Sequence, residues 1–99
     1  MATALDPYLV DTLMRDLVRH DRAPSAFLVY LWLWSKTRGT NRRKFGASLQ
    51  TIATETGLSK SSVQNALRRL RRRKLVTARH SGPTAAGIYE VLEPWRGAR

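Results

Sequence analysis

The sequence predicts a mainly α-helical domain with a small β-hairpin near its C-terminal end, an α+β fold. Two observations support this prediction. Helical spacing of apolar residues, or helix start and stop signals, appear at residues 6–20, 25–38, 48–56 and 60–73. Two stretches with strand character, 75–79 and 88–92, flank a turn-rich loop. The 99 residues suffice for one domain, residues 1–99, with a single modest core.

The first helix is expected over residues 6–20. Asp6 is a good N-cap, and Pro7 suits the first helical position because its missing N–H would have no partner there. Asp11 and Arg15 lie four residues apart on the polar side and are expected to pair. The apolar stripe that should face the core consists of Leu9, Val10, Leu13, Met14, Leu17 and Val18.

The second helix is expected over residues 25–38, between Pro24 and Gly39. Residues 27–34 are all apolar, so this helix has almost no polar face. A helix that is apolar all round is expected to be buried all round. One small core cannot easily surround it, so part of its surface should meet a second copy of the chain. We interpret its aromatic residues as core packing rather than as a ligand pocket.

Residues 48–74 contain the most specific pattern in the chain. Ser48 is an N-cap for a helix that ends at Thr56, and Gly57 suits the left-handed residue after it. Ser59 caps a second helix that starts at Lys60. Two short helices joined so tightly must cross steeply, which is the helix-turn-helix geometry. Thr56 is polar where such motifs bury an apolar residue. The residues expected between the two helices are Ile52, Ala53, Leu58, Val63 and Ala66.

The helix over residues 60–73 separates into a buried and an exposed face. The expected buried stripe is Val63, Ala66, Leu67 and Leu70. The opposite face presents Ser61, Asn65, Arg68 and Arg72, flanked by Gln64 and Arg69. Arg bonds guanine, Asn and Gln bond adenine, and Ser bonds phosphate. A merely solvated face explains the stretch poorly, because residues 60–74 include seven basic residues and no acid.

The net charge of +11 is unevenly distributed. From Lys36 to Arg79 there are thirteen Lys and Arg residues against the single acid Glu55. Before Lys36, three arginines nearly balance four aspartates. A polyanion is therefore the expected partner. An anionic membrane surface is a weaker candidate, because the arginine-rich helix has no exposed aromatic face.

The remaining segments predict a basic loop and a β-hairpin wing. Residues 39–44 form a loop by composition, and residues 45–47 can add a very short strand. The wing is expected over residues 75–92, with Arg79 and His80 at its base. Trp95 should pack on the core or on a partner chain. The basic loop residues either contact phosphates or are simply solvated, and the sequence leaves both open for Arg42, Arg43 and Lys44.

Several functional classes are disfavoured by the residue inventory. Cysteine is absent and the two histidines have no ligand motif, so no disulfide, metal or cofactor is expected. Acidic residues are scattered, which argues against an enzyme. The longest apolar run, residues 26–34, is too short for a membrane span, and the first residues do not resemble a signal peptide. We expect a cytoplasmic, nucleoid-associated protein.

Residues 48–76 resemble winged helix-turn-helix DNA-binding proteins, in particular the helix-turn-helix domains of plasmid and phage replication initiators. They are also similar to MarR-like and GntR-like bacterial regulators. The resemblance implies that helix 60–73 lies in the major groove of double-stranded DNA and that the wing contacts the backbone or minor groove. It implies base reading by Ser61, Ser62, Gln64, Asn65 and Arg68, and phosphate contacts by Arg69 and Arg72. The wing departs from the pattern because its tip lacks Lys or Arg.

These observations predict a sequence-specific DNA-binding protein, a transcriptional regulator of a bacterium, plasmid or phage. The alternatives are a DNA-binding component of plasmid or phage replication or partition, and a winged-helix module for protein–protein contact. The chain has no room for an effector domain, so no small-molecule effector is expected. Because one helix covers few base pairs, we expect a homodimer formed through residues 6–20 and 25–38. Further DNA contacts are expected from Ser59, Lys60, Arg73, Arg79 and His80.

Overall fold

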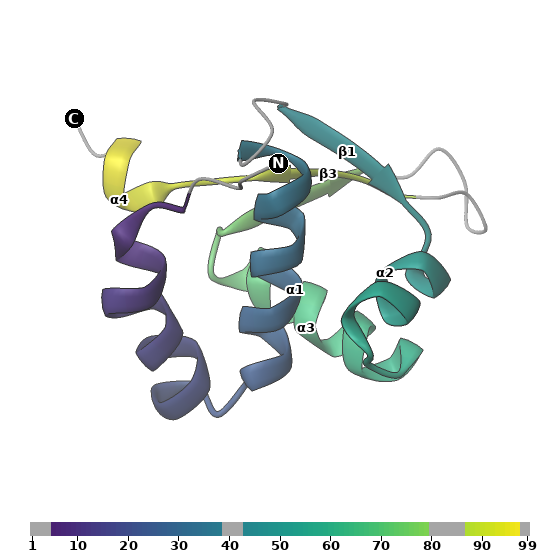
Figure 1. Cartoon of the computed structure of the whole chain (residues 1–99), viewed down its shortest axis with the longest axis horizontal. Coiled ribbons are helices and arrows are strands. Elements are labelled where there is room, and N and C mark those ends of the chain that lie inside the picture. Colours follow the sequence, from purple (N-terminus) through teal and green to yellow (C-terminus); the bar gives the residue numbers. More distant parts are fainter. Residues whose placement is uncertain (1–4, 39–42, 80–86, 98–99) are drawn as a thin grey trace.

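The computed structural model describes residues 5–38, 43–79 and 87–97. Helices lie side by side beneath a small sheet (Figure 1). A helical segment at residues 7–20 opens the fold and contains the turns η1 (Leu9–Leu13) and η2 (Asp16–His20). The other elements are, in order, α1 (Pro24–Lys36), β1 (Lys44–Ala47), α2 (Leu49–Thr56), α3 (Lys60–Arg72), β2 (Val76–Arg79), β3 (Gly87–Val91) and α4 (Pro94–Gly97).

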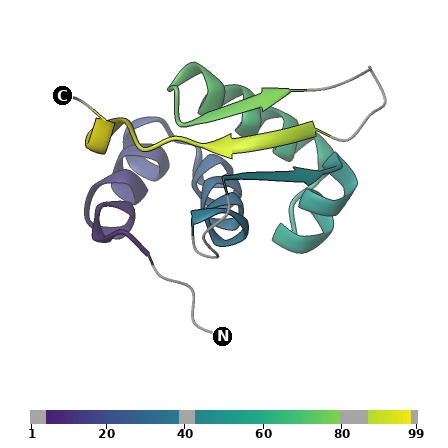
Figure 2. The same ribbon diagram turned by 90° about the horizontal axis from the view of Figure 1, so that it is seen from above.

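The sheet has three antiparallel strands in the order β1-β3-β2. The register places Tyr89 of the middle strand β3 opposite Phe45 of β1 on one side and Ala78 of β2 on the other. The two wing strands are confirmed, and the short strand expected at residues 45–47 begins one residue earlier. The sheet extends across one end of the helices (Figure 2). It packs on α1 and α3, which are also the two helices with the most extensive mutual packing.

Helix α1 lies at the centre of the molecule, against η2, α2, α3 and β3. Within the single chain this helix is not covered on every side, as expected of a helix that one small core cannot surround. Leu28 is 44% exposed, and Leu31 and Trp32 are only partly buried. Cover from a second copy of the chain stays a prediction. The helix ends at Lys36 rather than Arg38, and the buried Thr37 donates its hydroxyl to the Leu33 carbonyl at 2.7 Å.

The N-terminal helical segment has the expected extent but an unexpected winding. Asp6 accepts the Tyr8 N–H at 2.9 Å, as its N-cap role predicts. In η1 and η2 the backbone bonds are of the wider π type, from residue i+5 to residue i. The expected stripe divides into two rows that each repeat every four residues. Leu9, Leu13 and Leu17 are buried, whereas Val10, Met14 and Val18 are exposed. Asp11 and Arg15 form no ion pair in the described structure.

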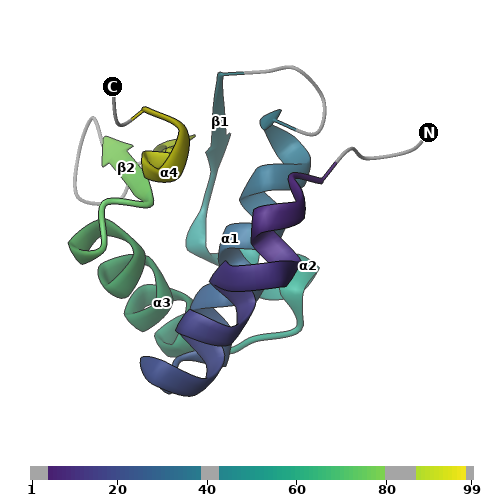
Figure 3. The same ribbon diagram turned by 90° about the vertical axis from the view of Figure 1, so that its left-hand side faces the viewer.

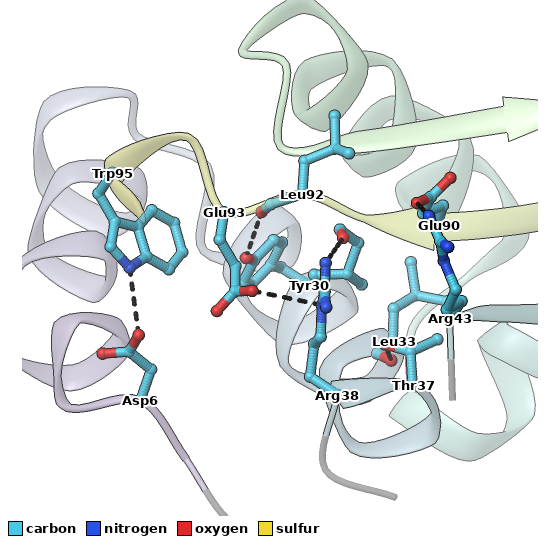
Figure 4. Close-up of polar contacts among 11 residues, drawn as sticks. Asp6, Tyr30, Leu33, Thr37, Arg38, Arg43, Glu90, Leu92, Glu93 and Trp95 are labelled. Carbon is cyan, nitrogen blue, oxygen red and sulfur yellow. Dashed lines mark hydrogen bonds and ion pairs between the residues drawn. The ribbon is translucent and has the colours of Figure 1, made fainter. Parts of the chain in front are cut away.

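The C-terminal residues are attached to the first two helices (Figure 4). The Trp95 ring stacks on Tyr8 with centroids 4.3 Å apart, and its indole N–H donates to Asp6 at 3.2 Å. Trp95 thus packs on its own chain, one of the two outcomes expected. The Tyr30 hydroxyl donates to the Leu92 carbonyl at 2.8 Å. These contacts fix the end of β3 against α1 and hence the sheet against α3.

Candidate nucleic-acid interface

Helices α2 and α3 form the helix-turn-helix that the sequence predicted. Ser48 Oγ accepts the Thr51 N–H at 3.0 Å, and Ser59 Oγ accepts the Ser62 N–H at 3.1 Å. Both expected N-caps are therefore confirmed. Gly57 has φ 80°, the left-handed conformation in which glycine avoids a Cβ penalty. These local bonds fix where each helix begins and ends, and so fix the direction of α3.

Thr56, the polar departure from the motif, is satisfied by its own helix. Its hydroxyl donates to the Ile52 carbonyl at 2.6 Å, so no polar group points unpaired into the crossing. The apolar crossing residues Ile52, Ala53, Val63 and Ala66 are buried, and Leu58 is partly buried against them. The packing between α2 and α3 therefore agrees with the sequence prediction.

The two predicted faces of α3 are confirmed. Val63, Ala66, Leu67 and Leu70 are buried. The exposed face presents Ser61, Gln64, Asn65, Arg68 and Arg72, with Ser62 and Arg69 half-exposed beside it. Asn65, Arg68, Arg69 and Arg72 line a shallow hollow of about 180 Å³. Figure 3 shows α3 along one side of the molecule, with no other helix over its outer side.

One contact orders the side chains on this face. Arg68 donates from Nη1 to Asn65 Oδ1 at 2.8 Å. The two residues are three positions apart, which places them on the same side of the helix one turn away from each other. Two of the five side chains expected to read bases are therefore bonded to each other on the free protein.

A second hollow, of about 230 Å³, lies between α3 and the sheet. Its polar rim includes Arg71, which was absent from the predicted DNA contacts. The pKa of the Tyr89 hydroxyl in this hollow is raised above its ordinary value, because burial raises it more than the positive charge of Arg71 lowers it. Arg71 lies three residues after Arg68, on a neighbouring part of the helix surface, and this spacing was the signal in the sequence for a further DNA contact. The lining residues are Leu49, Gln64, Leu67, Arg68, Arg71, Ala78 and Tyr89.

Arg73, expected to contact DNA, lies against the N-terminal helix instead. Its guanidinium is 3.5 Å from Asp21 Oδ1 and 3.9 Å from Asp16 Oδ2. The Asp21 side chain is only 5% exposed, and its Oδ2 is buried without a hydrogen bond. Arg22 and Lys74 follow Asp21 and Arg73 directly, and both have a positive φ, which marks a tight turn. The ion pair therefore joins two tight turns. Arg73 thereby links the end of α3 to the end of η2.

The remaining predicted residues lie on or beside the sheet, at the start of α3, or outside the described residues. Arg43 approaches Glu90 to 3.9 Å, with its side chain largely exposed (Figure 4). Lys44 and Arg79 are exposed on the sheet face that lies away from the helices, where they border a hollow together with Ile88. Ser59 and Lys60 begin α3. Arg42 and His80 fall outside the described residues.

With this geometry established, comparison with known proteins identifies the family. Residues 23–76 match a protein family described as a helix-turn-helix domain. The chain belongs to this family. The match covers more than half of the chain and extends from the residue before α1 to the first residue of β2. No curated protein matches the chain.

The helix-turn-helix domain and its three-stranded sheet together form a winged helix-turn-helix. Membership of this family supports a role in DNA binding. Within the described ranges, no helix is long and apolar enough to cross a membrane. In those same ranges, no three His, Cys, Asp or Glu side chains come together as a metal site would require.

Proposed function

We propose that this helix-turn-helix protein binds double-stranded DNA at specific sequences and regulates transcription in a bacterium, plasmid or phage. The observation that carries the proposal is the exposed face of α3. It combines amide and guanidinium groups, which bond base edges, with further arginines that bond phosphates. Helix α3 itself includes no acidic residue that would repel DNA.

Two sets of side chains on and beside α3 contact different parts of the DNA. Base edges are read by Ser61, Ser62, Gln64, Asn65 and Arg68 as α3 lies in the major groove. Phosphates are bound by Arg69 and Arg72 on the outer side, by Arg71 on the sheet side, and by Ser59 and Lys60 at the start of the helix. Contacts from Arg43, Lys44 and Arg79 extend the surface along the sheet. Arg73 is not among the proposed phosphate contacts, because its ion pair with Asp21 directs its side chain toward the N-terminal helix.

A role in plasmid or phage replication or partition would use the same surface, so this alternative differs only in the site that is bound. A protein–protein module is less well supported. Such a module needs no arginine-rich α3, whereas α3 and the turn after it, residues 60–74, include seven basic residues and no acid. The position of the bound sites relative to promoters or replication origins separates the first two alternatives.

We also propose that the protein acts as a homodimer through its N-terminal helix. Val10, Met14 and Val18 are 50%, 38% and 41% exposed and form one row, to which Leu5 adds a further exposed apolar side chain. The helix that includes this row lies at the edge of the molecule, beside α1, in Figure 1. Leu9, Leu13 and Leu17, the other row of the expected stripe, are buried in the chain's own core.

Charges beside this row suit a second copy of the same helix. Asp11, Arg15 and Arg19 are exposed and form no ion pair in the described structure. Two such helices packed antiparallel about a two-fold axis near Met14 would place Asp11 of one copy near the arginines of the other. The basic α3 helices would stay free for two half-sites about 34–36 Å apart.

Selection of bound sequences from a random pool of DNA duplexes tests the proposed function. We expect enrichment of an inverted repeat whose half-sites are one helical turn apart. Asn65→Ala should weaken the enrichment while leaving the protein folded, because Asn65 is exposed and serves no packing role. Recovery of random sequences by the wild-type protein would contradict sequence-specific binding.

A further inference from the structure

We infer that the bonded pair Asn65–Arg68 recognises guanine, and that Asn65 acts by positioning Arg68 rather than by reading adenine itself. The inference rests on the proposed function, since it names the base that this face of α3 selects. Its starting observation is the bond from Arg68 Nη1 to Asn65 Oδ1 at 2.8 Å.

The chemistry of the two groups fixes the orientation of the amide. A guanidinium has five N–H donors and no acceptor, so only the oxygen of Asn65 can face it. The Asn65 amide nitrogen, with its two donors, is therefore the end that remains available. Arg68 still has four N–H groups, because one of the five is used in the bond. The pair as a unit therefore presents mainly donors, with one lone pair of the Asn65 oxygen as its remaining acceptor.

Base edges in the major groove differ in their match to such a surface. Guanine presents two acceptors, N7 and O6, whereas adenine presents one acceptor and one donor. A free Asn matches adenine by using both its oxygen and its nitrogen. Asn65 is less able to do so while Arg68 occupies one lone pair of its oxygen and holds that oxygen toward the guanidinium. The donor-rich pair is therefore better matched to guanine than to adenine.

The bond also restricts the arginine before DNA arrives. Arg68 borders both the outer hollow and the hollow beside the sheet, so an unrestrained side chain has two places to go. Its bond to Asn65 keeps the guanidinium on the outer face, next to Arg69 and Arg72. Fewer conformations then need to be lost on binding, which favours affinity. Asn65 is thus a positioning residue for Arg68.

Substitution of guanine by 7-deazaguanine in the selected duplex tests this inference, because the analogue lacks the N7 acceptor. One guanine in each half-site should show a loss of wild-type affinity of at least several-fold, with about 150-fold as the upper limit because O6 remains as an acceptor. For the Arg68→Ala protein, replacing this guanine by 7-deazaguanine should leave the affinity unchanged. In Asn65→Ala the effect should shrink several-fold, because the arginine is no longer held in place.

Arg72→Ala is the matched control, because it removes an arginine from the same face without touching the pair. It should weaken binding and leave the 7-deazaguanine effect unchanged. A selected half-site with adenine at the sensitive position, or an undiminished effect in Arg68→Ala, would overturn the inference and leave sequence-specific binding intact. Equal binding of all duplexes by the wild-type protein would instead overturn the proposed function and this inference with it.

Discussion

Two arginines near the end of α3 show how much a residue's role depends on its surroundings. Arg71 borders the hollow beside the sheet and forms no ion pair in the described structure. Arg73 faces the buried carboxylate of Asp21 at 3.5 Å. The first is available for a phosphate, whereas the second brings a positive charge to a buried carboxylate whose Oδ1 also lies 3.0 Å from His20 Nδ1.

Substituting each of these arginines by Ala should therefore have different effects. Arg71→Ala should lower the steepness of the salt dependence of DNA binding by about 1, because one phosphate contact is lost. Arg73→Ala should leave that steepness unchanged and destabilise the fold by about 1–3 kcal/mol, because Asp21 loses its charged partner. Binding titrations at several salt concentrations and urea unfolding measure the two effects. Equal steepness for both variants would contradict the assignment.

Tyr30 predicts a specific dependence of stability on pH. Burial, and then the negative charge of Glu93, raise the pKa of its hydroxyl above the ordinary value of 10.0. Above about pH 10 the unfolded chain loses this proton while the folded chain keeps it, so the free energy of unfolding falls as pH rises. Tyr30→Phe should cost about 1 kcal/mol at neutral pH through its lost bond to Leu92.

Urea unfolding of the wild-type protein and Tyr30→Phe, at pH 7 and again near pH 11, measures this difference. The free energy of unfolding of the wild-type protein should exceed that of Tyr30→Phe by the full amount at pH 7, and this difference should shrink or reverse near pH 11. An advantage that stays constant across the range would show that Tyr30 ionises equally in both states.

At the scale of single elements, the turn between α2 and α3 depends on one glycine. Gly57 has φ 80° and open space around its Cα, so added bulk itself is not the problem there. Gly57→Ala should destabilise the protein by about 1–2 kcal/mol through the left-handed conformation alone. Gly46→Ala is the control, because a Cβ there would meet only a carbonyl at 3.8 Å. Thermal unfolding compares the two, and equal losses would contradict this explanation.

The helix-turn-helix could be predicted from the sequence because its signals are local. Ser48, Gly57 and Ser59 each act within a few residues, and the predicted start and end of α2 agree with the structure. The π winding of η1 and η2 could not be predicted, since both windings bury leucines along a similar stripe. The Arg73–Asp21 ion pair and the Arg68–Asn65 bond were likewise unpredictable. They depend on side-chain conformations and on elements that are distant in sequence.

At the scale of the whole molecule, the exposed row on the N-terminal helix predicts association. Met14→Glu should convert a dimer into a monomer, because a charge would then be buried at the proposed two-fold axis. Ile88→Glu, on the outer sheet face and similarly exposed, should leave the dimer intact. Sedimentation at micromolar protein concentration distinguishes the two. A wild-type protein that sediments as a monomer while binding both half-sites independently would contradict the dimer.

The molecule as a whole separates its charge from its apolar surface. The basic residues are concentrated from Lys36 onward, whereas the N-terminal helix that has the exposed apolar row is nearly neutral. Two copies can therefore approach through their neutral sides with little repulsion. Their basic sides remain available for DNA, and this arrangement is the central claim of the proposed function.

Titration of a DNA duplex at increasing salt concentration tests that claim most directly. If about five basic residues of each chain bind phosphates, a plot of log K against log salt should fall with a slope of roughly −4 to −5 per chain bound. Arg69→Ala and Arg72→Ala should each make the slope shallower by about 1. A near-flat slope for the wild-type protein would contradict DNA binding through the basic face of α3.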